Sequence, residues 1–171
     1  MIKLIEFENE NLIVNWKTIE LGLEGIGSIP SQITMDDILD FAVKSVQKND
    51  YNQEILELAG LSTDNSEEIQ KMVKKIVEKY EKNIDEQKEK RKLRLILLMK
   101  TMRNLNNNPL YGLIELTDFW QSVNDFGDKI PHTIQGVANE IAPEDYYTEK
   151  NFNSIINKHK DWIKNELKAL R

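Results

Sequence analysis

Apolar residues recur every three or four positions between Ile69 and Ile84, and this spacing constrains the fold more than any other feature of the chain. The stripe follows the repeat of an α-helix and has to face a core, because it would otherwise expose a continuous apolar face to water. An interruption is expected near 83–85. The helix after it opens with charged residues and becomes apolar nearly all round at 93–102, which is typical of a helix covered by its neighbours.

Helix-start signals divide the rest of the chain in the same way. Asn15 precedes an amphipathic segment, Thr34 forms a capping box with Asp37, and Asn108 stands directly before Pro109. A further helix is expected from Thr148 to the C-terminus. Only the stretches KLIEF and NLIV could form short strands. The sequence therefore predicts an all-α fold, an irregular bundle of about seven or eight helices in a single domain over residues 1–171.

Composition excludes several classes of protein. The 171 residues contain no cysteine, which removes disulfide scaffolds, thiolate metal sites and cysteine nucleophiles. The longest apolar run, 95–99, is far below the roughly 20 residues that span a bilayer, so no membrane association is expected. Acidic residues appear by Glu6, too early for the apolar core of a signal peptide. We therefore expect a cytoplasmic protein.

Negative charge is concentrated in the first part of the chain. Residues 1–68 contain fourteen Asp and Glu against four Lys, a net charge of −10, whereas the whole chain carries −6. An acidic half repels nucleic acid and attracts basic proteins. The only basic cluster, Lys88–Arg94, has no interleaved aromatic residues and is interpreted as a solvated helix face, so no nucleic-acid partner is expected.

The segment Asp125–Gly136 looks most like a site. Asp125, Asp128 and His132 could bind a metal in a small hydrolase, but helical metal sites usually contain repeated Glu-x-x-His or His-Glu-x-x-His patterns. The favoured interpretation is a corner between helices. His159 lies on the apolar stripe of the last helix, where a buried histidine bonded to the backbone is expected. We predict no catalytic residue, no metal and no cofactor.

Two groups of segments resemble known families. VNWKTIELGLEG, ITMDDILDFAVKSV and NQEILELAGL resemble the opening of an uncharacterised bacterial domain-of-unknown-function family. The stretches FWQSVNDFGDKIPHTIQG and YYTEKNFNSIINKHKDWI are similar to the ends of small helical proteins encoded beside bacterial polymorphic toxins. The matching positions specify a fold: Asn15, Trp16, Leu21, Gly22, Leu23, Asp37, Leu58 and Ala59. The resemblance implies an immunity-type role, in which the protein binds and blocks one cognate toxin.

The working hypothesis is a helical binding protein, a monomer or weak dimer, whose partner is a toxin with a basic surface. Tyrosine is favoured at such interfaces because it is large, rigid and tipped with a polar group. Of the adjacent residues Tyr146 and Tyr147, one is expected to pack inward. The expected partner-binding residues are Asp36, Asp37, Asp40, Glu54, Glu57, Tyr146 and Tyr147. The alternative is a helical adaptor or regulatory module without a toxin partner.

Overall fold

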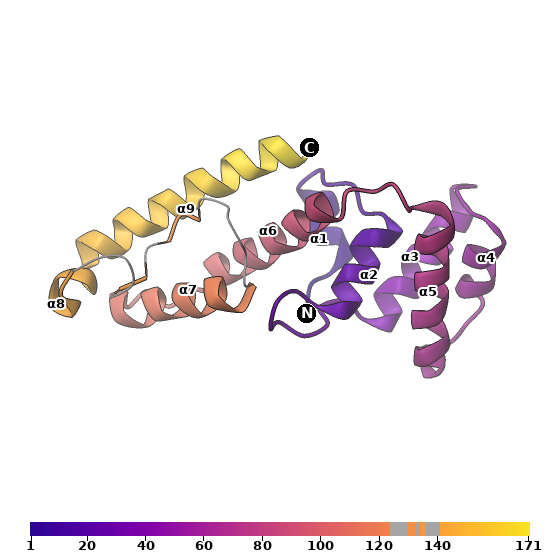
Figure 1. Ribbon diagram of the computed structural model, residues 1–171, viewed down its shortest axis with the longest axis horizontal. Helices are drawn as coiled ribbons and strands as arrows, with labels where there is room; N and C mark the ends of the chain where they lie inside the picture. The colour runs from indigo at the N-terminus through magenta and orange to yellow at the C-terminus, as the bar shows by residue number, and fades with distance from the viewer. Residues whose placement is uncertain (124–129, 133, 136–140) are drawn as a thin grey trace. The chain divides into compact units, whose positions relative to one another are not determined.

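The computed structural model describes residues 1–123, 130–132, 134–135 and 141–171 (Figure 1). Within them the chain forms nine α-helices and one short 3₁₀ helix, and these residues include no β-strand. The all-α prediction is confirmed. The chain divides into two compact units, Met1–Leu93 (unit 1) and Arg94–Arg171 (unit 2), so each is described by itself. The single domain over residues 1–171 stays a prediction.

Unit 1 contains five complete α-helices and the start of a sixth. They are α1 (Leu4–Asn9), α2 (Trp16–Glu24), α3 (Met35–Gln47), α4 (Gln53–Ala59), α5 (Ser66–Tyr80) and α6 (Glu86–Asn104), which continues into unit 2. The 3₁₀ helix η1 (Thr63–Asn65) directly precedes α5. In Figure 1, α3 and α5 each pack beside α4, and α2 packs against α5. Their apolar faces form one core that includes Trp16, Ile38, Leu58, Val73 and Ile76. The stripe therefore faces a core from Ile69 to Val77, as its spacing predicts, whereas Tyr80 is 47% exposed.

The predicted helix starts are confirmed at their caps. The Asn15 side chain accepts a hydrogen bond from the N–H of Thr18 at 2.8 Å. Thr34 and Asp37 form the expected reciprocal capping box. In unit 2, Asn108 Oδ1 accepts from the N–H of Leu110 at 3.0 Å, and Thr148 Oγ1 from that of Asn151 at 3.2 Å. Each cap satisfies a backbone donor that has no partner inside its helix.

Unit 2 is built from the second half of α6, together with α7 (Pro109–Val123), α8 (Pro143–Tyr146) and α9 (Glu149–Leu170). Helices α7 and α9 pack against each other, and α8 packs against the start of α9. Gly112 allows the close approach on α7, because a Cβ there would lie 2.7 Å from the Phe152 ring and against the carbonyl oxygen of Asn106. Residues 93–98 of α6 are all buried, as predicted.

Three local expectations differ from the structure. The stretch KLIEF lies largely in α1, where Leu4 and Phe7 are buried one helical turn apart. On α7, Leu110 and Ile114 are 41% and 39% exposed, and the buried face instead contains Leu116, Phe119 and Val123. The sequence pattern predicts a buried stripe through Leu110, Leu113, Ile114 and Thr117, with Trp120 one turn further on. Leu113 and Trp120 are buried as this pattern predicts, but the rest of the buried face is displaced, because the helix is apolar on more than one side.

The basic cluster Lys88–Arg94 is the third difference, because it is not a fully solvated face. Lys92 and Arg94 are only 4% and 1% exposed. Each has a carboxylate partner in the fold: Lys92 Nζ lies 2.8 Å from Glu89 Oε1, and Arg94 Nη2 lies 3.3 Å from Glu166 Oε1. Buried cations require such partners, since an isolated charge away from water is costly.

Candidate functional site

Unit 1 has a hollow between α1 and α3, which we call the α1/α3 hollow. Its volume is about 240 Å³. One wall is formed by residues 3–5 and Glu8, at the start of the chain and on α1. The other wall is formed by α3, which contributes Asp37, Asp40, Phe41 and Lys44. The hollow therefore combines apolar walls with carboxylates and ammonium groups, and it contains two of the acids predicted to bind a partner.

The chain beside the hollow is held by the backbone. The N–H of Ile2 donates to the carbonyl of Gln32 at 2.8 Å, and the N–H of Gln32 donates to the carbonyl of Gly22 at the same distance. These bonds bring the start of α1 to the loop just before the Thr34 cap. On α3, Asp37, Asp40 and Lys44 then follow at the three- and four-residue spacing that aligns side chains on one helix face.

The acids of the hollow differ in what they bind. Asp37 is committed to the helix cap, since its Oδ2 accepts from Thr34 Oγ1 at 2.6 Å. Glu8 and Asp40 are exposed, and within the described residues no hydrogen bond or ion pair occupies their carboxylates. Asp36 is also exposed, in the first turn of α3. Glu8 and Asp40 in the hollow, and Asp36 beside it on α3, are thus available for an outside partner.

The structure places Glu54 in a different role from the one predicted. This residue is 5% exposed, and its carboxylate accepts hydrogen bonds from Lys79 Nζ at 2.8 Å and from the Tyr80 hydroxyl at 2.7 Å. These two bonds lower the pKa of Glu54 to about 2. Glu54 therefore ties α4 to α5. Glu57, one turn later, is exposed and accepts a hydrogen bond from Gln53 Nε2 at 2.9 Å.

The tyrosine pair lies in unit 2. Tyr146 is 2% exposed, and burial raises its pKa to about 12. Tyr147 is half-buried, and its ring meets that of Tyr146 edge-on at 5.0 Å between centroids. The expectation that one tyrosine packs inward is confirmed for Tyr146. Because the acids belong to unit 1, the tyrosines and the hollow are treated as separate features.

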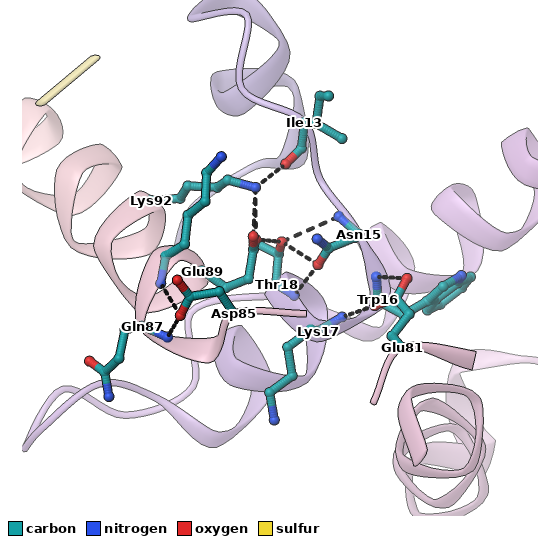
Figure 2. A network of polar contacts seen from close by, with 11 residues as sticks. Ile13, Asn15, Trp16, Lys17, Thr18, Glu81, Asp85, Gln87, Glu89 and Lys92 are labelled. Carbon is teal, nitrogen blue, oxygen red and sulfur yellow. Dashed lines mark hydrogen bonds and ion pairs between the residues drawn. The ribbon is translucent and has the colours of Figure 1, made fainter. Parts of the chain in front are cut away.

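A buried polar network joins the start of α2 to the start of α6, as Figure 2 shows. Glu89, 2% exposed, accepts from Thr18 Oγ1 at 2.5 Å and from Lys92 Nζ at 2.8 Å. Lys92 Nζ also donates to the carbonyl of Ile13 at 2.8 Å. Buried polar side-chain atoms need hydrogen-bond partners in the protein, because they can no longer bond to water. The network has a structural role, and the sequence signal for it was the Glu89–Lys92 spacing of three residues on one helix.

Figure 2 also shows the carboxylate of Glu81 at the N-terminus of α2. Glu81 accepts hydrogen bonds from the backbone N–H groups of Trp16 at 3.1 Å and Lys17 at 2.7 Å. Burial raises the pKa of Glu81, and the two N–H donors oppose that rise. A carboxylate at a helix N-terminus is favourable because the unpaired N–H groups and the helix dipole both attract negative charge.

His132 and His159 lie together in unit 2. His159 is fully buried, and its Nδ1 lies 2.8 Å from the carbonyl oxygen of Ile155, as expected for a histidine bonded to the backbone. His132 is 5% exposed, with its Nε2 2.7 Å from Thr117 Oγ1. Asp125 and Asp128, the other groups of the metal-hydrolase alternative, lie outside the described residues. In the segments that the structure does describe, no three His, Asp or Glu side chains form a metal-binding group.

The fold and the hollow define the class first: an all-α protein with a mixed-charge surface site on unit 1. The chain belongs to the bacterial family described as "Uncharacterized protein conserved in bacteria (DUF2247)", whose model matches residues 4–167. The resemblance to an uncharacterised bacterial family is thereby confirmed. No curated protein matches the chain significantly, and no solved structure does. Among the helices that the structure describes, none combines the length and the apolar character needed to cross a membrane.

Proposed function

We propose that this protein is an immunity-type binding protein that neutralises a cognate bacterial toxin by direct association, without catalysing a reaction. The observation that carries the proposal is the pair of exposed carboxylates of Glu8 and Asp40 in the α1/α3 hollow, to which no other described residue is bonded, with exposed Asp36 on the same helix as Asp40. They stand beside exposed apolar side chains, Ile5 at 48% and Val43 at 38%. An apolar centre with a charged rim is the usual anatomy of a protein interface.

The distribution of charge supports a basic partner. Unit 1 contains nineteen acidic and thirteen basic residues, whereas unit 2 contains ten of each. The net charge of −6 therefore lies on unit 1, which carries the hollow. Complementary charge of this kind accelerates encounter and excludes partners of like charge, and it contributes more to association rate than to affinity.

The test is association with the product of the toxin gene encoded beside this one. Purified proteins are mixed, and the association rate is followed at about 50 and 300 mM salt, because screening weakens exposed charges. Asp40→Lys is the test variant and Glu78→Lys, an exposed acid on α5, is the control with the same change of charge. We expect Asp40→Lys to slow association about tenfold or more and Glu78→Lys to have a much smaller effect.

Two results would contradict parts of the proposal. Equal rates for the two variants would mean that the hollow is not the contact surface. The absence of any association with the neighbouring gene product would remove the immunity role. The adaptor alternative would then gain support if the neighbouring genes encode no toxin and the chain co-purifies with a cellular assembly through the Asp40 surface.

A further inference from the structure

The chain has two histidines, and both are buried in unit 2 beside α7. The ring centroids of His132 and His159 are 5.7 Å apart. His159 projects from α9 and contacts Trp120 of α7, whose indole Nε1 lies 2.9 Å from His159 Nε2. Trp120 in turn meets the ring of Trp162 edge-on at 5.5 Å. The histidine pair therefore lies where α7 and α9 pack together.

The partners of His159 determine its protonation state. The indole Nε1 of Trp120 can only donate a hydrogen bond, so His159 Nε2 has to be the unprotonated, accepting nitrogen. The proton of the neutral ring is then on Nδ1, which donates to the carbonyl of Ile155 at 2.8 Å. Both ring nitrogens are satisfied, but only while the imidazole is neutral.

His132 has the same requirement for a different reason. Thr117 has one hydroxyl proton, which it donates to the carbonyl of Leu113 at 2.9 Å. His132 Nε2 therefore donates to Thr117 Oγ1, and Nδ1 carries the lone pair. Within the described residues this buried Nδ1 has no hydrogen-bond partner. A second proton on His132 would be buried next to the His159 ring with no acceptor among those residues.

Among the described residues, the charged groups near the pair do not compensate a positive imidazole. Arg94 of α6 lies 5.1 Å from the Trp162 ring and pairs with Glu166. On α7 and α9 the remaining charged side chains close to the two histidines in sequence are exposed to water: Glu115, Asp118, Lys158, Lys160 and Asp161. The second titratable ring beside His159 is that of His132, with 5.7 Å between the ring centroids.

We infer that the bond from Trp120 to His159 is an acid-released latch between α7 and α9. Protonation of His159 replaces the accepting lone pair with an N–H that points at the indole N–H, so the bond is lost. If His132 is protonated as well, two positive rings repel each other in a buried site. The packing of α7 on α9 then opens, while unit 1 contains no histidine.

The direction of the pH effect follows from burial. Burial lowers the pKa of His132 from 6.5 to about 4, and burial also lowers the pKa of His159. The unfolded or opened unit therefore binds protons more readily than the folded one. The stability that neutral His132 contributes is complete above pH 6.5 and is lost as the pH falls from 6.5 towards 4, and neutral His159 acts in the same direction. In this window each histidine raises the opening constant by up to about tenfold per pH unit.

The experiment is a titration of the full-length protein from pH 7.5 to 4.5. Amide hydrogen exchange of α7 and α9 reports opening, and the NMR signal of the Trp120 indole N–H reports the bond. We expect exchange, corrected for its intrinsic pH dependence, to accelerate in α7 and α9 below pH 6.5, with a simultaneous shift of the indole signal. His159→Gln supplies a non-titrating oxygen that can accept the indole proton. This variant is expected to lose most of the acceleration, whereas His132→Gln keeps the response of the indole signal.

A second variant keeps the inference testable if His159→Gln fails to fold. Trp120→Phe removes the indole donor, so His159 Nε2 no longer has to stay unprotonated. The titration midpoint of His159, read from its ring protons, should then rise towards 6.5. An unchanged midpoint in Trp120→Phe would overturn the latch. So would an indole signal in the natural protein that stays constant down to pH 4.5.

Discussion

Two buried polar clusters, one in each unit, satisfy their groups in different ways. In unit 1 the cluster uses charges: Glu89 and Lys92 pair in the interior, and Glu81 caps the backbone of α2. Unit 2 also has a buried ion pair, Arg94 with Glu166, but the cluster around its two histidines relies on neutral groups, with an indole N–H donating to an imidazole nitrogen. The difference has a consequence. A charged network is sensitive to loss of one partner, whereas a neutral imidazole is sensitive to gain of a proton.

Of the stability changes that we predict, the loss caused by removing Glu89 should be the largest. Glu89→Leu leaves the Lys92 ammonium buried beside the Ile13 carbonyl alone, and we expect a loss of about 3–5 kcal/mol in the free energy of unfolding. The measurement is urea denaturation. The double variant Glu89→Leu, Lys92→Leu removes both charges and should recover much of that loss. If the double variant is as unstable as the single one, the penalty comes from packing and not from an unpaired charge.

A smaller loss of stability is expected from a substitution at Gly112, where α7 closely approaches Phe152 of α9. Gly112→Ala places a methyl group against the Asn106 carbonyl and 2.7 Å from the Phe152 ring. Such overpacking costs typically about 1–3 kcal/mol. Gly60→Ala in unit 1 is the matched control, because a Cβ there lies no closer than 3.4 Å to another group. Thermal denaturation of the two variants distinguishes them, and equal melting temperatures would mean that α7 shifts to accept the methyl group.

The smallest predicted effect is the loss of stability of unit 1 in acid. The bonds from Lys79 and Tyr80 hold the pKa of Glu54 near 2, below its ordinary value of 4.5. Glu54 therefore contributes stability that is present above pH 4.5 and is lost as the pH falls towards 2. The contribution is modest, since Lys79 is exposed and solvent screens the pair.

Hydrogen exchange between pH 6.5 and 2 can separate the two units. Amides of α7 and α9 should lose protection first, and those of α4 and α5 only below pH 4.5. Glu54→Gln should weaken the low-pH response of α4 without changing that of α9. Loss of protection in both units at one common pH would contradict the difference drawn between them.

Local signals predicted the helices well, because caps and periodicity act within a few residues. Asn15, Thr34, Asn108 and Thr148 begin helices where the sequence places them. The missed elements were short: α1 has six residues and α8 has four. Helices of that length depend on tertiary packing more than on their own propensity, so local patterns identify them poorly.

The candidate site was only partly predictable. Asp40, one of the predicted partner-binding acids, is exposed and lines the α1/α3 hollow. Glu54 looked equivalent in sequence, but a lysine and a tyrosine from α5 enclose it. Glu8 was not singled out, since α1 itself was not predicted. A carboxylate becomes available or committed according to neighbours that are distant in the chain.

The sequence by itself determined that the chain is helical, where most helices begin, and that negative charge gathers in its first part. These properties depend on neighbouring residues and on counts. Only the tertiary structure decided that Glu89 and Lys92 are buried together, that Trp120 donates to His159, and that Asp40 remains open beside a hollow. The physical reason is that a polar side chain takes its role from the groups that surround it, and packing brings those groups from other helices.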